Sequence, residues 1–132
     1  MTLVAKQIYS QGLQMFKAWN FLTGILAGFT VSAITAFSHS DRIVTGGHII
    51  RYGFFLSMLL IVLTQLWIGR FTGSRLTTLG FALTWIGATV WFGSGTADND
   101  MTLPQSNWST AYVAFGALLV TMVASIPVLR QK

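Results

Sequence analysis

The segment Trp67-Ile68-Gly69-Arg70-Phe71-Thr72-Gly73-Ser74-Arg75-Leu76 is a short basic turn between two long apolar runs. Residues 52–68 before it and residues 76–92 after it contain no charged side chain. Arg70 and Arg75 are costly to place in hydrocarbon, whereas uncharged runs of this length are typical of membrane-spanning helices. The segment therefore predicts a turn at a membrane surface, and the positive-inside rule predicts the cytoplasmic surface.

The composition of the whole chain agrees with a membrane protein. Of the 132 residues, 53% are hydrophobic and 8% are charged, whereas soluble proteins carry about 25% charged residues. The eight Lys and Arg residues lie at the edges of apolar runs and form no stripe, which argues against nucleic acid as a partner. The chain has no cysteine, so it can form neither a disulfide nor a thiolate metal site.

Hydropathy predicts an all-α, integral membrane four-helix bundle in one domain, residues 1–132. The expected spans cover about residues 19–37, 50–68, 75–93 and 110–129. In residues 1–17, Leu3, Val4, Ile8, Met15 and Phe16 recur at roughly helical spacing, and Gly12 weakens a continuous helix. This segment is either an interfacial amphipathic segment or a frayed lead-in to the first span.

The positive charges predict the orientation. With both termini in the cytoplasm, six cations face inward, and only Arg42 and Arg51 face outward. The six are Lys6, Lys17, Arg70, Arg75, Arg130 and Lys132. No segment resembles a cleaved signal peptide, so we expect none.

Small residues recur every four positions in three of the four spans, and this spacing predicts close helix packing. The predicted helix-packing residues are Gly24, Gly28, Ser32 and Ala36; Gly80, Thr84 and Ala88; and Ala117, Thr121 and Ser125. Such faces serve either the protein's own bundle or a dimer. Pro127 is expected to kink or end the last helix.

Four polar or aromatic residues within the predicted spans are singled out: Asn20, Gln65, Thr84 and Trp85. They are candidates for lining a polar pathway, although a structural role in packing is favoured for Gln65 and Trp85. In the first exterior loop, His39, Asp41 and His48 are weak candidates for metal ligands. Their spacing matches no established site, so we expect no metal and read them as solvated loop residues.

Apart from Arg51 and Arg75 at the ends of two spans, no Asp, Glu, Lys, Arg or His falls inside a predicted span, and such residues are what proton-coupled transporters require. The chain resembles small multidrug transporters in length and helix count, but it lacks their glutamate in the first helix. No catalytic motif is present, so we expect neither an enzyme nor a bound cofactor. Haem ligation by His39 or His48 is a remote alternative.

The loop between the last two spans holds Asp98-Asn99-Asp100, which we read as a solvated turn rather than a calcium loop, because the glycine and distal glutamate of such a loop are missing. Asn107-Trp108-Ser109 matches the glycosylation sequon.

The last two-thirds of the chain resembles an uncharacterised family of small four-span actinobacterial membrane proteins. The resemblance rests on Gly69–Leu76, the third span, the acidic loop with Leu103-Pro104 and the last span. The resemblance implies a bacterial inner (plasma) membrane and no particular activity.

These observations favour a non-catalytic accessory or assembly subunit of a larger membrane complex. Its expected partners are membrane lipid and either other membrane subunits or further copies of itself. One alternative is a small homo-oligomeric carrier or flippase-like protein for a lipid or lipid-linked sugar, in which the four pathway candidates would face a shared polar cavity. Another is an exterior metal- or haem-binding protein.

Overall fold

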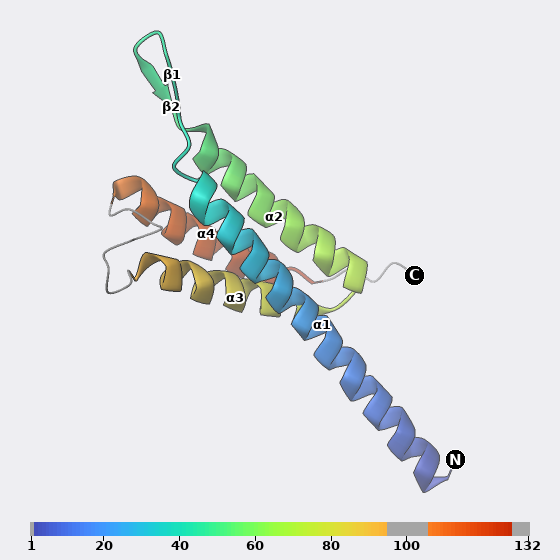
Figure 1. Ribbon diagram of the computed structural model, residues 1–132. Coiled ribbons are helices and arrows are strands. Elements are labelled where there is room, and N and C mark those ends of the chain that lie inside the picture. Colours follow the sequence, from blue (N-terminus) through green and yellow to red (C-terminus); the bar gives the residue numbers. More distant parts are fainter. Residues whose placement is uncertain (1, 95–105, 128–132) are drawn as a thin grey trace.

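The computed structural model describes residues 2–94 and 106–127 (Figure 1). Helix α1 (Leu3–Ser38) is followed by strands β1 (Ile43–Thr45) and β2 (His48–Ile50), and then by helices α2 (Tyr52–Thr72), α3 (Arg75–Gly93) and α4 (Asn107–Ser125). All four helices are long and apolar enough to cross a membrane. The described part of the chain is therefore a mostly helical, four-helix protein.

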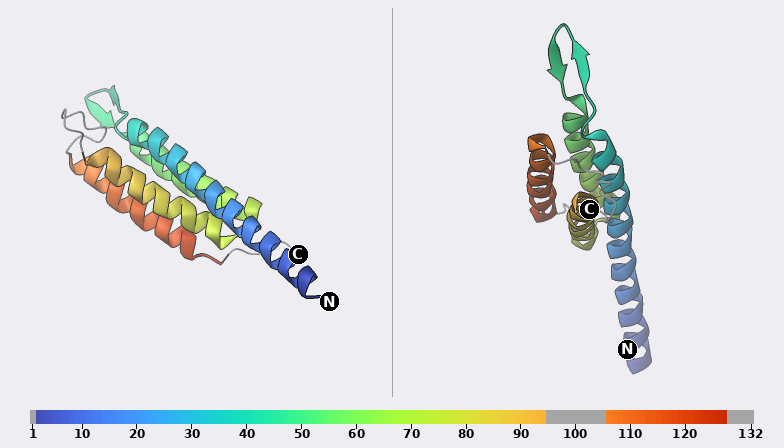
Figure 2. Two further views of the ribbon diagram at one scale, coloured as in Figure 1. Left: turned by 60° about the horizontal axis from the view of Figure 1, so that its bottom comes forward. Right: turned by 60° about the vertical axis from the view of Figure 1, so that its left-hand side comes forward.

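Helix α1 is much longer than the predicted first span. It runs without interruption for 36 residues, about 54 Å at 1.5 Å per residue, and its N-terminal half projects from the bundle (Figures 1 and 2). Gly12 does not break it. A glycine inside a helix costs about 1 kcal/mol relative to alanine, and a single residue of this kind is tolerated between good helix formers.

The first loop contains a short β-hairpin that was not predicted from the sequence. Strands β1 and β2 pair antiparallel, with Val44 opposite Ile49. Gly46 and Gly47 join them with φ values of 60° and 82°, which is the backbone that a two-residue hairpin turn of right-handed twist requires. The hairpin stands away from the helices, and every one of its strand residues is exposed (Figure 1).

The basic turn is tighter than expected. Helix α2 includes Gly69, Arg70 and Phe71 and ends at Gly73, which adopts the left-handed conformation at φ 59°. The side chain of Ser74 then accepts a hydrogen bond from the Leu76 amide and starts α3. Two residues thus reverse the chain.

Helix α4 begins three residues earlier and ends four residues earlier than the predicted span. Ser106 caps its start by accepting from the Ser109 amide at 3.1 Å. At its end, Ile126 is extended because the residue before a proline avoids the helical conformation. Pro127 therefore lies beyond the helix rather than in its last turn.

Neighbouring helices in the chain run in opposite directions, and α1 packs most extensively against α3 (Figure 2). One end of the bundle carries the hairpin, and we call it the hairpin end. The other carries Gly73 and Ser74, and we call it the turn end. Helix α1 begins and α4 ends at the turn end, so Lys6, Lys17, Arg70 and Arg75 lie there, while Arg42 and Arg51 lie at the hairpin end. Arg130 and Lys132 lie outside the described residues.

Candidate functional site

Helices α1 and α3 approach each other closely along glycines. A methyl group at Gly28 would lie 2.5 Å from the Phe81 carbonyl oxygen, and one at Gly80 would lie 2.8 Å from the Phe21 carbonyl oxygen. Gly24 fits over the Thr77 carbonyl group in the same way. No larger residue fits at this spacing. The small-residue sides of α1 and α3 therefore pack against each other within one chain.

Hydroxyl groups tie the same helices together in the interior. Ser32 and Thr89 share a hydrogen bond of 2.9 Å. Thr35 lies 2.6 Å from the Tyr112 hydroxyl and also donates to the Val31 carbonyl oxygen. Each of these pairs joins α1 to another helix, so they fix the relative positions of α1, α3 and α4.

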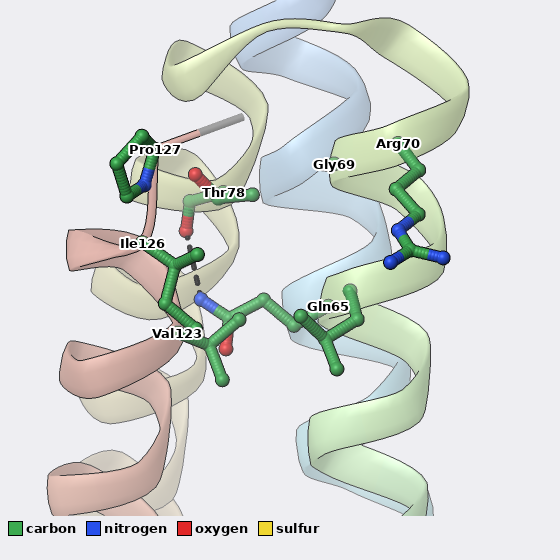
Figure 3. Close-up of a pocket in the computed structure, with 8 residues that line it drawn as sticks. Gln65, Gly69, Arg70, Thr78, Val123, Ile126 and Pro127 are labelled. Carbon is green, nitrogen blue, oxygen red and sulfur yellow. Dashed lines mark hydrogen bonds between the residues drawn. The ribbon is translucent and has the colours of Figure 1, made fainter. Parts of the chain in front are cut away.

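Gln65 joins the other three helices. Its Nε2 donates to the carbonyl oxygens of Thr78 at 3.1 Å and Val120 at 3.0 Å, while its Oε1 has no hydrogen-bond partner among the described residues. Figure 3 shows the side chain reaching from α2 toward α3 and α4. The pocket beside it, with Arg70 and Pro127 at the turn end, has a volume of about 100 Å³. That volume suits a few water molecules, not a substrate.

The four pathway candidates do not share a cavity. Trp85 is fully buried, and its ring packs edge-on against Tyr112 at 5.6 Å. Thr84 is half-buried on α3 and does not line the pocket beside Gln65 or the one beside Asn20. Asn20 lies at a separate surface pocket beside Lys17 at the turn end, away from Gln65. The structure therefore places these side chains in four different surroundings.

The helix-packing candidates divide by helix. On α1 and α3 all are buried except Thr84. On α4, Ala117 is half-buried, whereas Thr121 and Ser125 are exposed and donate back to carbonyl groups of their own helix. The close contact of α4 is made instead by Gly116, where a methyl group would meet the Trp85 ring. Trp85 in the middle of a predicted span indicated that a small residue must lie opposite its ring, but nothing in the sequence pairs it with Gly116.

His39 is the C-cap residue of α1, at the hairpin end of the bundle. It does not form a metal cluster with Asp41 and His48. Its Nδ1 lies 2.8 Å from the Ala36 carbonyl oxygen and must therefore carry the proton, which leaves Nε2 to accept from the Ser109 hydroxyl at 3.2 Å. His48 lies on the exposed hairpin. The described residues contain no group of three potential metal ligands. Burial lowers the pKa of His39, which keeps the ring neutral.

A basin of about 390 Å³ opens beside His39 at the hairpin end. Its lining is His39, Ser40, Arg42, Arg51, Ser106, Trp108 and Ser109. The Arg51 guanidinium carbon lies 4.8 Å from the centre of the Trp108 ring, which is a cation–π contact. From the sequence the two arginines served only as orientation signals, because nothing in it indicates that Arg42 and Arg51 lie next to residues 106–109.

The projecting half of α1 is amphipathic. Val4, Ile8, Met15 and Trp19 recur along one side of the helix and are 63 to 65% exposed. Tyr9 and Phe16 widen this side, and we call the six residues the apolar face. Lys6, Gln7, Ser10, Gln14 and Lys17 occupy the other side. The division is not complete, since Gln11 falls at the edge of the apolar face and Leu13 falls on the polar side. Leu3, which the sequence spacing grouped with the apolar residues, falls on the polar side.

Comparisons with models of protein families, with curated proteins and with solved structures give no match. The class of protein is therefore defined by its own geometry: a small four-helix protein whose helices can each cross a membrane.

Proposed function

We propose that this protein is a non-catalytic accessory or assembly subunit of a larger membrane complex. The observation that carries the proposal is the apolar face of α1, which extends beyond the other helices and leaves large side chains such as Ile8 and Phe16 more than half exposed. A straight helix that continues out of a membrane bundle carries its apolar side into water unless another surface covers it. A second polypeptide on the same membrane surface would do so.

The interior supports a structural rather than a transporting role. Fully buried side chains such as Trp85, Tyr112, Phe81 and Ile61 fill the space between the helices. Ser32, Thr35, Tyr112 and the Gln65 amide nitrogen pair with another side chain or a backbone carbonyl group, and the pocket near Gln65 is small. Among the described residues, four buried polar atoms have no hydrogen-bond partner: Ser57 Oγ, Gln65 Oε1, Thr77 Oγ1 and Trp85 Nε1. A carrier needs a larger polar cavity near its centre, so the carrier alternative has less support from the described residues.

The hairpin offers a second uncovered surface, at the other end. Ile43, Val44, Ile49 and Ile50 are all more than half exposed, and an isolated two-stranded hairpin is at best marginally stable in water. Within the proposal, the bundle is an anchor in a bacterial plasma membrane with both termini in the cytoplasm. It then presents the apolar face of α1 on the cytoplasmic side and the hairpin outside.

Gentle detergent extraction followed by native mass determination tests this proposal, with two double variants that differ only in the face they alter. Ile8→Glu with Met15→Glu puts two charges on the apolar face, while Gln7→Glu with Gln14→Glu puts the same charges at the same spacing on the polar side. We expect a different polypeptide in fixed stoichiometry with the wild type and with the polar-side variant, and its loss from the apolar-face variant. A homo-oligomer carrying only lipid in all three preparations would contradict the proposal.

A further inference from the structure

We infer that the basin at the hairpin end binds the phosphate group of an anionic phospholipid, held by Arg42 and Arg51, with the acyl chains lying along the aromatic surface between α2 and α4. This inference does not depend on the proposed function.

The polar half of the site comes from two segments far apart in the sequence. Arg42 and Arg51 flank the hairpin, and Ser40 lies in the same basin. Ser106 and Ser109 also line it, but Ser109 donates its hydroxyl hydrogen to His39 and Ser106 donates to Ser109, so the two arginines are the main donors for a phosphate. Guanidinium groups form charge-assisted, often paired hydrogen bonds to phosphate oxygens. Ser106 and Ser109 also belong to the first turn of α4, where the helix dipole favours a negative charge.

Arg51 is held in place for this role. Its guanidinium group lies over the Trp108 ring, and the ring stands beneath it as a flat support. The N–H groups on the edge of a stacked guanidinium remain available to a ligand. Arg42 is exposed and can turn toward a ligand held by Arg51.

The apolar half of the site begins at Trp108. Phe54 packs edge-on against Trp108 at 5.7 Å and against Phe115 at 6.4 Å. Phe55 and Phe115 are 67% and 56% exposed, so an apolar surface from α2 and α4 continues below the basin. Tryptophan is typical of the level at which lipid head groups meet hydrocarbon. Cations above the ring and phenylalanines below it match the order of groups in a phospholipid.

The charge of the site predicts which phospholipid binds. The residues that line the basin include two arginines and no carboxylate, and His39 is neutral. Asp41 follows Ser40 in the sequence and lies close enough to His39 to act on its charge. Two arginines and one aspartate leave a net positive charge around the basin among the described residues. A choline head group would place its own cation beside these arginines, whereas a glycerol head group adds no positive charge. Each arginine near the membrane surface contributes about fivefold to the binding of an anionic lipid. Phosphatidylglycerol should therefore bind more tightly than phosphatidylcholine.

Native mass spectrometry of the delipidated protein, titrated with an equimolar mixture of the two lipids, tests the inference. With about fivefold from each of the two arginines, we expect the wild type to retain phosphatidylglycerol with a preference of about 25-fold. Arg42→Gln with Arg51→Gln should remove the preference, while Lys17→Gln with Arg70→Gln, which removes two cations at the turn end, should keep it. Equal binding of the two lipids by the wild type, or an equal loss in both variants, would overturn the inference.

Two further measurements separate the alternatives. Arg42→Gln alone changes an exposed side chain, so this variant should fold like the wild type by circular dichroism and still lower the preference about fivefold. Inorganic phosphate and glycerol phosphate, added in excess, should leave bound phosphatidylglycerol in place, since they lack the acyl chains. Complete displacement by either would show a site for soluble phosphate and overturn the assignment to lipid.

Discussion

The hydroxyl oxygen of Thr35 lies 2.6 Å from the hydroxyl oxygen of Tyr112, in the interior between α1 and α4. Thr35 also donates to the carbonyl oxygen of Val31, one turn earlier in its own helix. Tyr112 must then be the donor in the bond between the two side chains. Hydrogen bonds of this kind between membrane helices are worth about 0.6 kcal/mol on average and up to about 1.7 kcal/mol.

Replacing Thr35 by valine should therefore destabilise the bundle by about 1 kcal/mol. Thr121→Val is the matched control, because Thr121 makes the same bond to its own helix but is exposed. The free energy of unfolding in mixed micelles measures both, and the Tyr112→Phe variant completes a double-mutant cycle with Thr35→Val. Additive losses in that cycle would mean that the two hydroxyl groups do not interact.

The glycine contact between α1 and α3 should be intolerant of any side chain. Gly28→Val places a methyl group against the Phe81 carbonyl oxygen, so we expect a loss of about 1–3 kcal/mol or a failure to fold. Gly87→Val is the control, since a side chain at Gly87 meets no atom within 4 Å. Thermal unfolding in detergent, followed by circular dichroism, compares them. Similar midpoints for the two variants would rule out the close approach of α1 and α3.

The stability of the protein should depend on pH through His39. Burial lowers the pKa of His39 in the folded state below the unfolded value of about 6.5. The unfolded state therefore binds the proton more tightly, so stability is complete above about pH 6.5 and falls as the pH drops toward the folded pKa. His39→Gln should flatten this dependence between about pH 7 and pH 5, whereas His48→Gln, on the exposed hairpin, should not. A wild-type midpoint that does not change in this range would contradict the assignment.

The proposed orientation can be tested with single cysteines, because the chain contains none. Thr45→Cys lies on the hairpin, and Lys6→Cys lies on the projecting half of α1. A maleimide that does not cross membranes should label Thr45→Cys in intact cells and Lys6→Cys only after lysis. Labelling of Lys6→Cys in intact cells would reverse the orientation.

The helical class of the fold was predictable because four uncharged runs of about the right length leave few alternatives. The recurrence of small residues at Gly24, Gly28 and Gly80 indicated the sides of α1 and α3 that pack against each other. The same spacing on α4 marked Thr121 and Ser125, which are exposed, because periodicity alone does not say which side of a helix meets a neighbour. The length of α1 was underestimated, since Gly12 and the polar residues around it resemble a helix end although no proline or capping residue stops the helix there.

The candidate sites were less predictable for a related reason. His39 and Ser109 are 70 positions apart, and Arg51 and Trp108, which also meet, are likewise far apart in the sequence. Nothing in the local sequence around either segment indicates that the two meet. His39, Asp41 and His48 are close in the sequence, but His39 is buried at the end of α1 whereas His48 lies on the exposed hairpin.

The measurement that tests the proposed role most directly is site-specific photo-crosslinking in living cells from positions 8 and 14 of α1. Position 8 lies on the apolar face, and position 14 lies on the polar side of the same projecting segment. The account predicts that a photoreactive side chain at position 8 crosslinks to one different membrane polypeptide, and that position 14 does not. Crosslinks from position 8 only to lipid, or only to another copy of this chain, would contradict the account.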